Sequence, residues 1–340
     1  MTIAFFEEEA VDREKLRTLF PEETLLFLPA PLNVDTVVGA QNADVASVFV
    51  RSSVTADVLS RLPHLRFLAT RSMGFDHVDL PACQARGVMV AHVPVYGENT
   101  VAEHTFALIL AISRRIFQSY ERTERMKFGR AGLRGFDLAG KTLGVVGVGR
   151  IGRNVCRIAK EGFAMRVLAQ DIRPDAPLAS ALGFTYAASL DDLLRASDVI
   201  TLHAPYGPST HHLLNRENLA RVKRGAILVN TARGGLVDTQ ALLWALNEGI
   251  LLGAGLDVLE EENFVYEEAE LLINNVPAGR DLATVLRNHI LVERDDVIVT
   301  PHNAFNSHEA VTRIFETTVD NIRSFRLGKP INVVPASGPR

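Results

Sequence analysis

Residues with catalytic chemistry follow three apolar, strand-like runs in the second half of the chain. Arg233 ends one such run and precedes two glycines, the three glutamates Glu260 to Glu262 follow Leu256-Asp257, and His302 follows Thr300-Pro301. An arginine can hold a carboxylate through a bidentate fork, and a histidine can protonate a carbonyl oxygen. A nearby carboxylate favours the protonated imidazole. The set therefore suits the reduction of a 2-oxo acid.

Each of these residues alone also has a simpler interpretation. A strand-end arginine is usually part of a salt bridge, a glutamate in an acidic run is usually solvated, and a histidine after proline usually lies in an ordinary loop. Ligands of doubly wound folds bind at the carboxyl ends of strands, where all three residues are predicted. Their coincidence favours a site.

A glycine-rich segment, residues 143–152, joins a strand-like run to a helical run. It contains Gly147, Gly149 and Gly152 in the GxGxxG spacing that allows a tight turn, a close pyrophosphate and close helix packing. The following helix N-terminus would face the phosphates. Asp171 ends the next predicted strand, at the distance typical of a carboxylate that binds ribose hydroxyls, so NAD is favoured over NADP. Arg173 weakens that preference slightly.

The elements that must position these residues alternate between short strands and amphipathic helices, which indicates an α/β fold with two doubly wound parallel-sheet domains. We expect a discontinuous substrate domain, 1–99 and 303–340, and an NAD-binding domain, 100–302. One long helix is expected over 100–121, and an insertion-like segment between Glu262 and Val297. The predicted strands are residues 3–6, 46–50, 67–70, 88–91, 142–146, 166–169, 199–203, 226–230, 252–257 and 297–300.

Further motifs extend along the chain: Thr70 to Asp76, Pro94 to His104, His203-Ala204-Pro205, Asn230 to Gly234, Leu256-Asp257-Val258 and Thr300-Pro301-His302. With the GxGxxG segment, they resemble the D-isomer-specific 2-hydroxyacid dehydrogenases over nearly the whole chain. The resemblance implies a Rossmann-type cofactor domain with a smaller flavodoxin-like substrate domain. It places the catalytic arginine on Arg233, the acid/base histidine on His302 and its carboxylate on Glu262, with Glu260 and Glu261 as neighbouring candidates.

The same resemblance implies the binding residues. Substrate contacts would come from the backbone N–H groups near Met73 and Gly74, besides Arg233. The helix from Thr100 resembles the family's dimer-forming segment, which implies a homodimer. Cofactor contacts, besides the three glycines, would come from Arg150, Ile151, Asp171, Ala204, Pro205, Thr210, Thr231, Ala232 and Asp257.

Within the family, the chain most resembles the D-lactate dehydrogenase branch, because of Tyr96, Phe305 and the long stretch between Glu262 and His302. Tyr96 and Phe305 would size the substrate pocket, although core packing explains them equally well. Two alternatives stay open: a non-catalytic NAD(H)-sensing protein of the same fold, and a glyoxylate or hydroxypyruvate reductase. The formate branch of the family carries glutamine beside its histidine, so Glu262 argues against a formate dehydrogenase.

Composition excludes several other classes. The 340 residues are 47% hydrophobic and 22% charged, as in ordinary globular proteins, and the net charge of −4 favours neither nucleic acid nor an anionic surface. The two cysteines form no CxxC pair, which fits a cytoplasmic protein. We expect no metal site, since His211 and His212 are adjacent rather than four residues apart, and no signal peptide or membrane partner.

Overall fold

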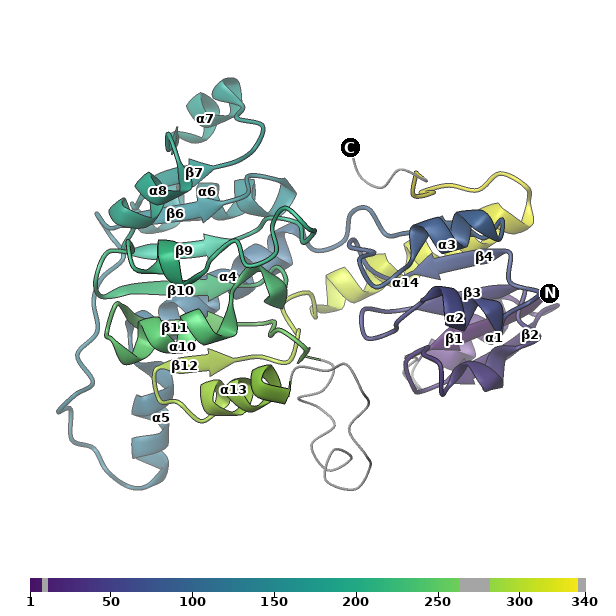
Figure 1. The fold of residues 1–340 in the computed structure, drawn as a ribbon, viewed down its shortest axis with the longest axis horizontal. Helices are drawn as coiled ribbons and strands as arrows, with labels where there is room; N and C mark the ends of the chain where they lie inside the picture. The colour runs from purple at the N-terminus through teal and green to yellow at the C-terminus, as the bar shows by residue number, and fades with distance from the viewer. Residues whose placement is uncertain (8–11, 263–281, 336–340) are drawn as a thin grey trace. The chain divides into compact units, whose positions relative to one another are not determined.

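The computed structural model describes residues 1–7, 12–262 and 282–335. The chain divides into two compact units. Unit 1 comprises Met1–Tyr96 and Ser307–Arg340, and unit 2 comprises Gly97–Asn306. Each unit is an α/β layer structure built on its own parallel sheet (Figure 1). The fold class expected from the sequence is confirmed.

Unit 1 contains a five-stranded parallel sheet in the order β2-β1-β3-β4-β5, the flavodoxin-like strand order. Its strands are β1 (Thr2–Phe6), β2 (Thr24–Leu28), β3 (Val45–Val48), β4 (Phe67–Thr70) and β5 (Met89–Ala91). Two apolar core clusters cover its two faces, one beneath α2 and α3, the other beneath α1 and α14. These helices are α1 (Arg13–Leu19), α2 (Ala56–Ser60), α3 (Leu80–Ala85) and α14 (His308–Arg326), and a 3-10 turn, η2, spans Val37–Ala40.

Unit 2 contains a seven-stranded parallel sheet in the order β12-β11-β10-β9-β6-β7-β8. This is the Rossmann order with one added edge strand, and the strand order reverses between β6 and β9. The strands are β6 (Thr142–Val146), β7 (Arg166–Gln170), β8 (Thr185–Tyr186), β9 (Val199–Leu202), β10 (Ala226–Asn230), β11 (Leu251–Leu256) and β12 (Val297–Val299).

Helices pack on both faces of this second sheet, because its strands carry apolar side chains toward both sides. Along β10, for example, Leu228 belongs to one core cluster while Ile227 and Val229 belong to the other. One face carries α8 (Leu190–Ala196), α9 (Arg216–Leu219), α10 (Thr239–Asn247) and α13 (Leu282–Val292). The other carries α4 (Glu98–Ser113), α6 (Arg150–Phe163) and α7 (Ala176–Leu182), while α5 (Ile116–Glu124) and the 3-10 turn η3 (Gly234–Leu236) complete the unit.

The structure corrects four expectations. The short strand β8 was missed, and so was β2. The helix expected over 100–121 is two helices, because Arg115 adopts φ 53° and the carbonyl of Ser113 accepts the N–H of Phe136. The segment treated as an insertion contains the crossover helix α13, which buries Val285 and Leu291; residues 263–281 lie outside the described part of the chain.

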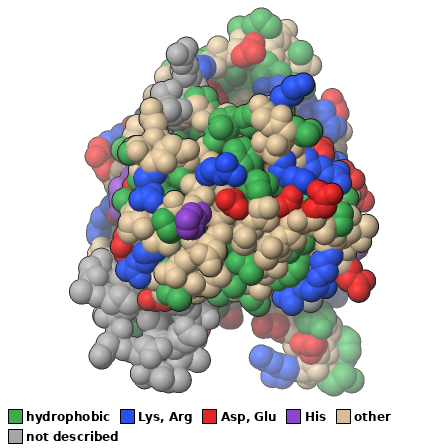
Figure 2. Space-filling view, turned by 90° about the vertical axis from the view of Figure 1, so that its right-hand side faces the viewer, with side chains coloured by type: hydrophobic (Ala, Val, Ile, Leu, Met, Phe, Trp, Pro, Cys, Tyr) green, Lys and Arg blue, Asp and Glu red, His purple; other side chains and the backbone are tan. Residues whose placement is uncertain are grey.

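Acidic and basic side chains are interspersed over the face drawn in Figure 2, with no field of one sign. Among the described residues, no helix is long and apolar enough to cross a membrane, and no group of His, Cys, Asp and Glu side chains has metal-binding geometry. Cys83 and Cys156 are free and buried, and burial raises the pKa of their thiols to about 11 and about 12.

Candidate active site

The turn after β6 is shaped by glycines that have no room for a side chain. Gly147 has φ 91°, and a Cβ there would lie 2.7 Å from the backbone nitrogen of Ala204. A Cβ on Gly152 would lie 2.0 Å from the carbonyl oxygen of Gly147. Gly149 instead faces open space and gives α6 no side-chain cap. The turn therefore presents an open helix N-terminus, where anions bind.

Asp171 closes the other side of this turn. Its Oδ2 accepts the N–H of Val148 over 2.7 Å, and its Oδ1 accepts the N–H of Arg173 over 2.9 Å. Arg150 lies 3.4 Å from Glu98 of α4, and Ile151 packs against the core beneath α6. The predicted nucleotide-binding residues after β6 and β7 thus lie together in unit 2.

The loop after β9 contains His203, Ala204, Pro205 and Thr210. The hydroxyl of Thr210 donates to the carbonyl of Pro205 over 2.8 Å and closes the loop. His203 Nε2 bonds the Thr201 hydroxyl over 3.0 Å, while its buried Nδ1 has no partner among the described residues. Burial lowers the pKa of His203 to about 3, so this ring is neutral at physiological pH.

The loop after β10 holds Arg233 half-buried. The Asn230 side chain accepts the N–H of Ala232 and donates to the carbonyl of Arg233, at 3.0 and 2.9 Å. The Thr231 hydroxyl lies 3.0 Å from that of Thr105 on α4. A Cβ on Gly234 would lie 2.0 Å from the carbonyl carbon of Leu259. Glycine at this position therefore lets the arginine loop lie directly against the turn that carries the acidic run.

The loop after β12 holds His302 in a left-handed conformation, with φ 48°. Buried Asp257 fixes this loop: its carboxylate accepts the N–H groups of Asn303 (2.8 Å) and Ala304 (2.9 Å) and the hydroxyl of Thr300 (2.5 Å). His104 of α4 lies 3.1 Å from the same hydroxyl. A non-glycine residue keeps a positive φ only when surrounding contacts, such as these hydrogen bonds, hold its backbone in place. Asp257, predicted to contact the cofactor, has its carboxylate committed to the loop.

Of the three consecutive glutamates, Glu262 contacts His302. Its Oε1 lies 2.7 Å from His302 Nδ1, and its Oε2 accepts the N–H of Leu259 over 3.2 Å. Glu260 instead bonds His212, and Glu261 is exposed at φ 52°. Because the carboxylate accepts at Nδ1, Nε2 is the nitrogen left to exchange a proton, and no described residue bonds it.

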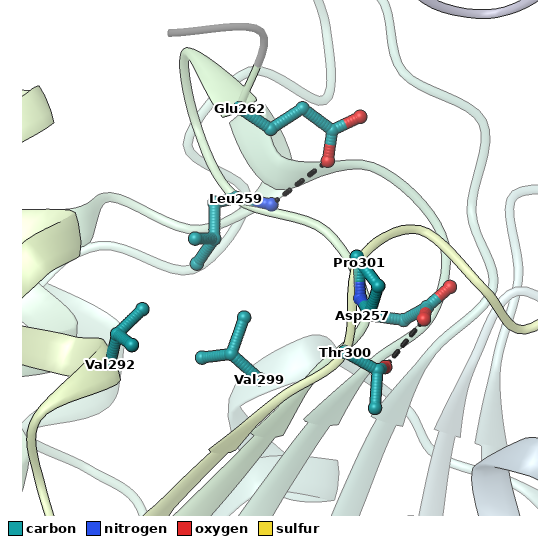
Figure 3. Close-up of a pocket in the computed structure, with 7 residues that line it drawn as sticks. All are labelled: Asp257, Leu259, Glu262, Val292, Val299, Thr300 and Pro301. Atoms are coloured by element: carbon teal, nitrogen blue, oxygen red, sulfur yellow. Dashed lines mark hydrogen bonds between the residues drawn. The ribbon is translucent and has the colours of Figure 1, made fainter. Parts of the chain in front are cut away.

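A small cavity of about 140 Å³ is lined by Glu262, Asp257, Leu259 and the start of the His302 loop. Figure 3 shows Glu262 above it and Asp257 with Thr300 to one side, while Val292 and Val299 form its apolar floor. Both Glu262 and Asp257 therefore line the cavity together with apolar side chains.

In unit 1, Met73 and Gly74 form a turn after β4. The carbonyl of Met73 lies 2.9 Å from His92 Nδ1, and the carbonyl of Gly74 accepts the Ser72 hydroxyl over 2.6 Å. Within the described residues, no acceptor takes the N–H of Met73 or Gly74. Two such amides at one turn suit an anion. Tyr96 is half-buried in unit 1, and Phe305 half-buried in unit 2.

Similarity to known proteins identifies the family to which the chain belongs. Residues 106–304 match the family model described as D-isomer specific 2-hydroxyacid dehydrogenase, NAD binding domain. The chain belongs to the D-isomer-specific 2-hydroxyacid dehydrogenases. It is 35% identical to the D-lactate dehydrogenase of Escherichia coli (97% of this chain, 98% of that protein) and 34% identical to the glycerate dehydrogenase of Methylorubrum extorquens (98% and 99%).

A solved structure of D-lactate dehydrogenase from Aquifex aeolicus, complexed with NAD and lactic acid, matches with a TM-score of 0.86. Identity is 35%, and the match covers 96% of each chain. This protein is therefore an NAD-dependent 2-hydroxyacid dehydrogenase. The residues present fit that cofactor: the open N-terminus of α6 suits the pyrophosphate, Gly149 leaves it space, and Asp171 offers a carboxylate for ribose.

Sequence reasoning missed several residues that support this dehydrogenase site. The motifs contain Thr300, His104 and Gly234, but their sequence context alone assigns no role to them. The pair formed by His212 and Glu260 was not predicted at all. A signal existed for Gly234, since a glycine directly after a strand-end arginine indicates close backbone approach. The other three depend on contacts between residues far apart in the sequence.

Proposed function

We propose that this dehydrogenase interconverts pyruvate and D-lactate, acting chiefly as a 2-oxo acid reductase. The observation that carries the proposal is the 2.7 Å contact between His302 Nδ1 and Glu262 Oε1 at the carboxyl edge of the unit 2 sheet. A histidine paired in this way can both donate and accept a proton at Nε2. The similarity to proteins named D-lactate dehydrogenase supports pyruvate as the oxo acid.

In the proposed mechanism, NADH when bound supplies the hydride that reduces C2 of the acid. His302 Nε2 gives its proton to the carbonyl oxygen, and Glu262 stabilises the imidazolium beforehand and orients the ring. Arg233 binds the substrate carboxylate through its guanidinium fork. The N–H groups of Met73 and Gly74 in unit 1 are the further substrate contacts that the family resemblance implies. In the oxidative direction, neutral His302 accepts the hydroxyl proton.

The cofactor would lie on the turn of Gly147, Gly149 and Gly152, with Asp171 on the ribose. We propose further contacts from the residues predicted by family resemblance, namely Arg150, Ile151, Ala204, Pro205, Thr210, Thr231, Ala232 and Asp257. The hydrogen bonds of Asp257 to the His302 loop suggest that its main part is to hold that loop. Unit 2 would then be the NAD-binding domain and unit 1 the substrate domain.

A second substrate class is favoured by a specific similarity. The glycerate dehydrogenase relative is about as similar as the D-lactate dehydrogenase relative, at 34% against 35% identity. Hydroxypyruvate and glyoxylate therefore stand as alternative substrates of the same site. They differ from pyruvate only at the group on C2, which Tyr96 and Phe305 would contact.

The test is NADH oxidation by the purified protein with pyruvate, hydroxypyruvate, glyoxylate, 2-oxobutyrate and phenylpyruvate, with NADPH as a parallel donor. We expect the largest kcat/KM with pyruvate and NADH, and D-lactate as the product. A larger value with hydroxypyruvate would replace the substrate assignment. Absence of turnover with every acid, in protein that binds NADH, would favour the NAD(H)-sensing alternative over the proposed reaction.

We also propose a homodimer in the cytoplasm. Helix α5 carries Ile116, Phe117 and Tyr120 about half exposed or more (52%, 49% and 60%), which is unusual for large apolar side chains close together on one short helix. Light scattering after gel filtration should give twice the chain mass, and Phe117→Glu should halve it. The two free, buried cysteines suit a reducing compartment, and cell fractionation tests the location.

A further inference from the structure

The structure contains a second histidine–glutamate pair, whose glutamate, Glu260, lies two residues before Glu262. His212 Nε2 lies 2.6 Å from Glu260 Oε1, and the two side chains are 35% and 14% exposed. His212 belongs to the loop after β9, and Glu260 to the turn after β11. The mechanism described above uses neither residue.

Glu260 is held by three elements. Besides His212, its carboxylate accepts the N–H of Thr239, the first residue of α10, over 2.8 Å, and the hydroxyl of the same residue. Its backbone carbonyl accepts the side-chain amide of Asn288 over 2.6 Å, and Asn288 on α13 is fully buried. A carboxylate with three donors has little freedom, so the position of Glu260 is fixed.

Glu262 takes its own position from this anchor. Glu261, at φ 52°, turns the chain between them, and Glu262 Oε2 returns to the N–H of Leu259 (Figure 3). The turn 259–262 is thus anchored at Glu260 and closed by Glu262, whose other oxygen lies on His302. The loop after β10 that carries Arg233 (the arginine loop) contacts the same turn, because Gly234 packs against the backbone of Leu259 and Glu260.

His212 links the pair to two further loops. Its N–H donates to the carbonyl of Gly235 over 2.8 Å, and its ring stacks on His211 with centroids 3.8 Å apart. His211 Nδ1 lies 3.1 Å from the Tyr206 hydroxyl. The loop with Ala204 to Thr210, the arginine loop and the glutamate turn therefore all make contacts with His212 or its neighbour His211.

We propose that His212 and Glu260 form a positioning pair that sets Glu262 against His302. The inference rests on the proposed roles of Glu262 and His302. The pair touches no reacting atom in this account. It acts through Glu262, because Glu260 fixes the turn from which the Glu262 side chain extends.

The test compares Glu260→Gln with the matched control Glu261→Gln, an exposed neighbour in the same turn. We expect Glu260→Gln to lower kcat for 2-oxo acid reduction about 10- to 100-fold, the cost of a small misplacement of a reacting group. Glu261→Gln should match the wild type.

A double-mutant cycle separates positioning from general destabilisation. In a Glu262→Gln background, Glu260→Gln should cost less than about twofold more, because its effect passes through Glu262. The pH at which the rate is half-maximal should move in the same direction in Glu260→Gln and Glu262→Gln. Equal losses from Glu260→Gln in both backgrounds, or a wild-type rate and pH profile in the single variant, would overturn the proposal.

The partner histidine gives a second test that does not alter the acidic turn. His212→Gln keeps a side-chain N–H donor and should retain most of the wild-type kcat, whereas His212→Ala should lose activity as Glu260→Gln does. Equal kcat values in the two variants would contradict the pairing. Loss of activity in Glu262→Gln but not in Glu260→Gln or His212→Ala would overturn the positioning role of His212 and Glu260 and leave the proposed role of Glu262 intact. A wild-type protein without turnover would overturn the proposed function itself.

Discussion

The backbone N–H of His302 donates to the carbonyl oxygen of Asp257 over 2.8 Å. The Asp257 carboxylate holds the next two N–H groups of the same loop, so one buried aspartate at the end of β11 fixes three consecutive residues after β12. This explains how His302 keeps φ 48° and how its ring stays in reach of Glu262. Strain of this kind is typical of functional sites.

Replacing Glu262 by glutamine should lower kcat about 10- to 100-fold. The amide keeps the shape of the side chain but removes the charge that stabilises protonated His302. Steady-state pyruvate reduction at saturating NADH measures the loss. A wild-type kcat in Glu262→Gln would contradict the assigned role.

Replacing Asp171 by asparagine should reduce the preference for NADH over NADPH about tenfold. The variant keeps an acceptor for the N–H of Val148 but loses the charge that repels a 2′-phosphate. The ratio of kcat/KM values for the two donors is the measurement. Glu161→Gln, which removes a carboxylate that is 65% exposed on α6, is the control. An unchanged ratio in Asp171→Asn would argue against the ribose contact.

Gly234→Ala should reduce both stability and activity. The added Cβ would lie 2.0 Å from the backbone of Leu259, so the arginine loop or the glutamate turn must move. Overpacking of this kind typically costs about 1–3 kcal/mol. The free energy of unfolding measured in denaturant and the kcat should both fall. Gly129→Ala, where no atom lies within 4 Å of the added carbon, is the control for the substitution alone. A fully active Gly234→Ala protein would show that the two loops need no close approach.

His203 should make folding stability depend on pH. Its pKa is lowered from 6.5 to about 3 by burial, so the unfolded chain binds a proton that the folded protein excludes between those values. The free energy of unfolding should therefore fall as the pH drops below 6.5, by about 1.4 kcal/mol per pH unit from this group.

The comparison of variants isolates this contribution. His203→Asn should show a shallower loss of stability than the wild type between pH 6.5 and 4.5 in urea titrations. His64→Asn removes an exposed imidazole and corrects for the loss of a histidine as such. The same slope in the wild type and in His203→Asn would contradict a neutral buried ring.

Much of the fold follows from local sequence patterns. The strands of unit 2 that bear the site were predicted within one residue at each end, because parallel strands buried on both faces read as short apolar runs. Strand β8 was missed because two residues carry no periodicity, and the break after α4 because the N–H of Phe136 captures the Ser113 carbonyl. The second cause is a tertiary contact that no local pattern reveals.

The sequence predicted which strand ends carry the site residues, but it predicted few of the contacts between those residues. Spacing identified Arg233 and His302 as candidates, while family resemblance favoured Glu262 among three consecutive acidic residues. In the structure Glu262 contacts His302, whereas Glu260 and Glu261 do not. Glu261 has a left-handed conformation and separates Glu260, which bonds His212, from Glu262. The hydrogen bonds from Asp257 to the His302 loop join residues more than forty positions apart and were invisible in the sequence.

The most direct measurement is pyruvate reduction by His302→Ala, with NADH binding followed in the same preparation by the fluorescence of the bound cofactor. The account predicts that kcat falls about 10²- to 10⁴-fold, the usual contribution of a general acid, while the Kd for NADH stays within about twofold of the wild type. Undiminished turnover, or loss of turnover together with loss of NADH binding, would contradict the role assigned to His302.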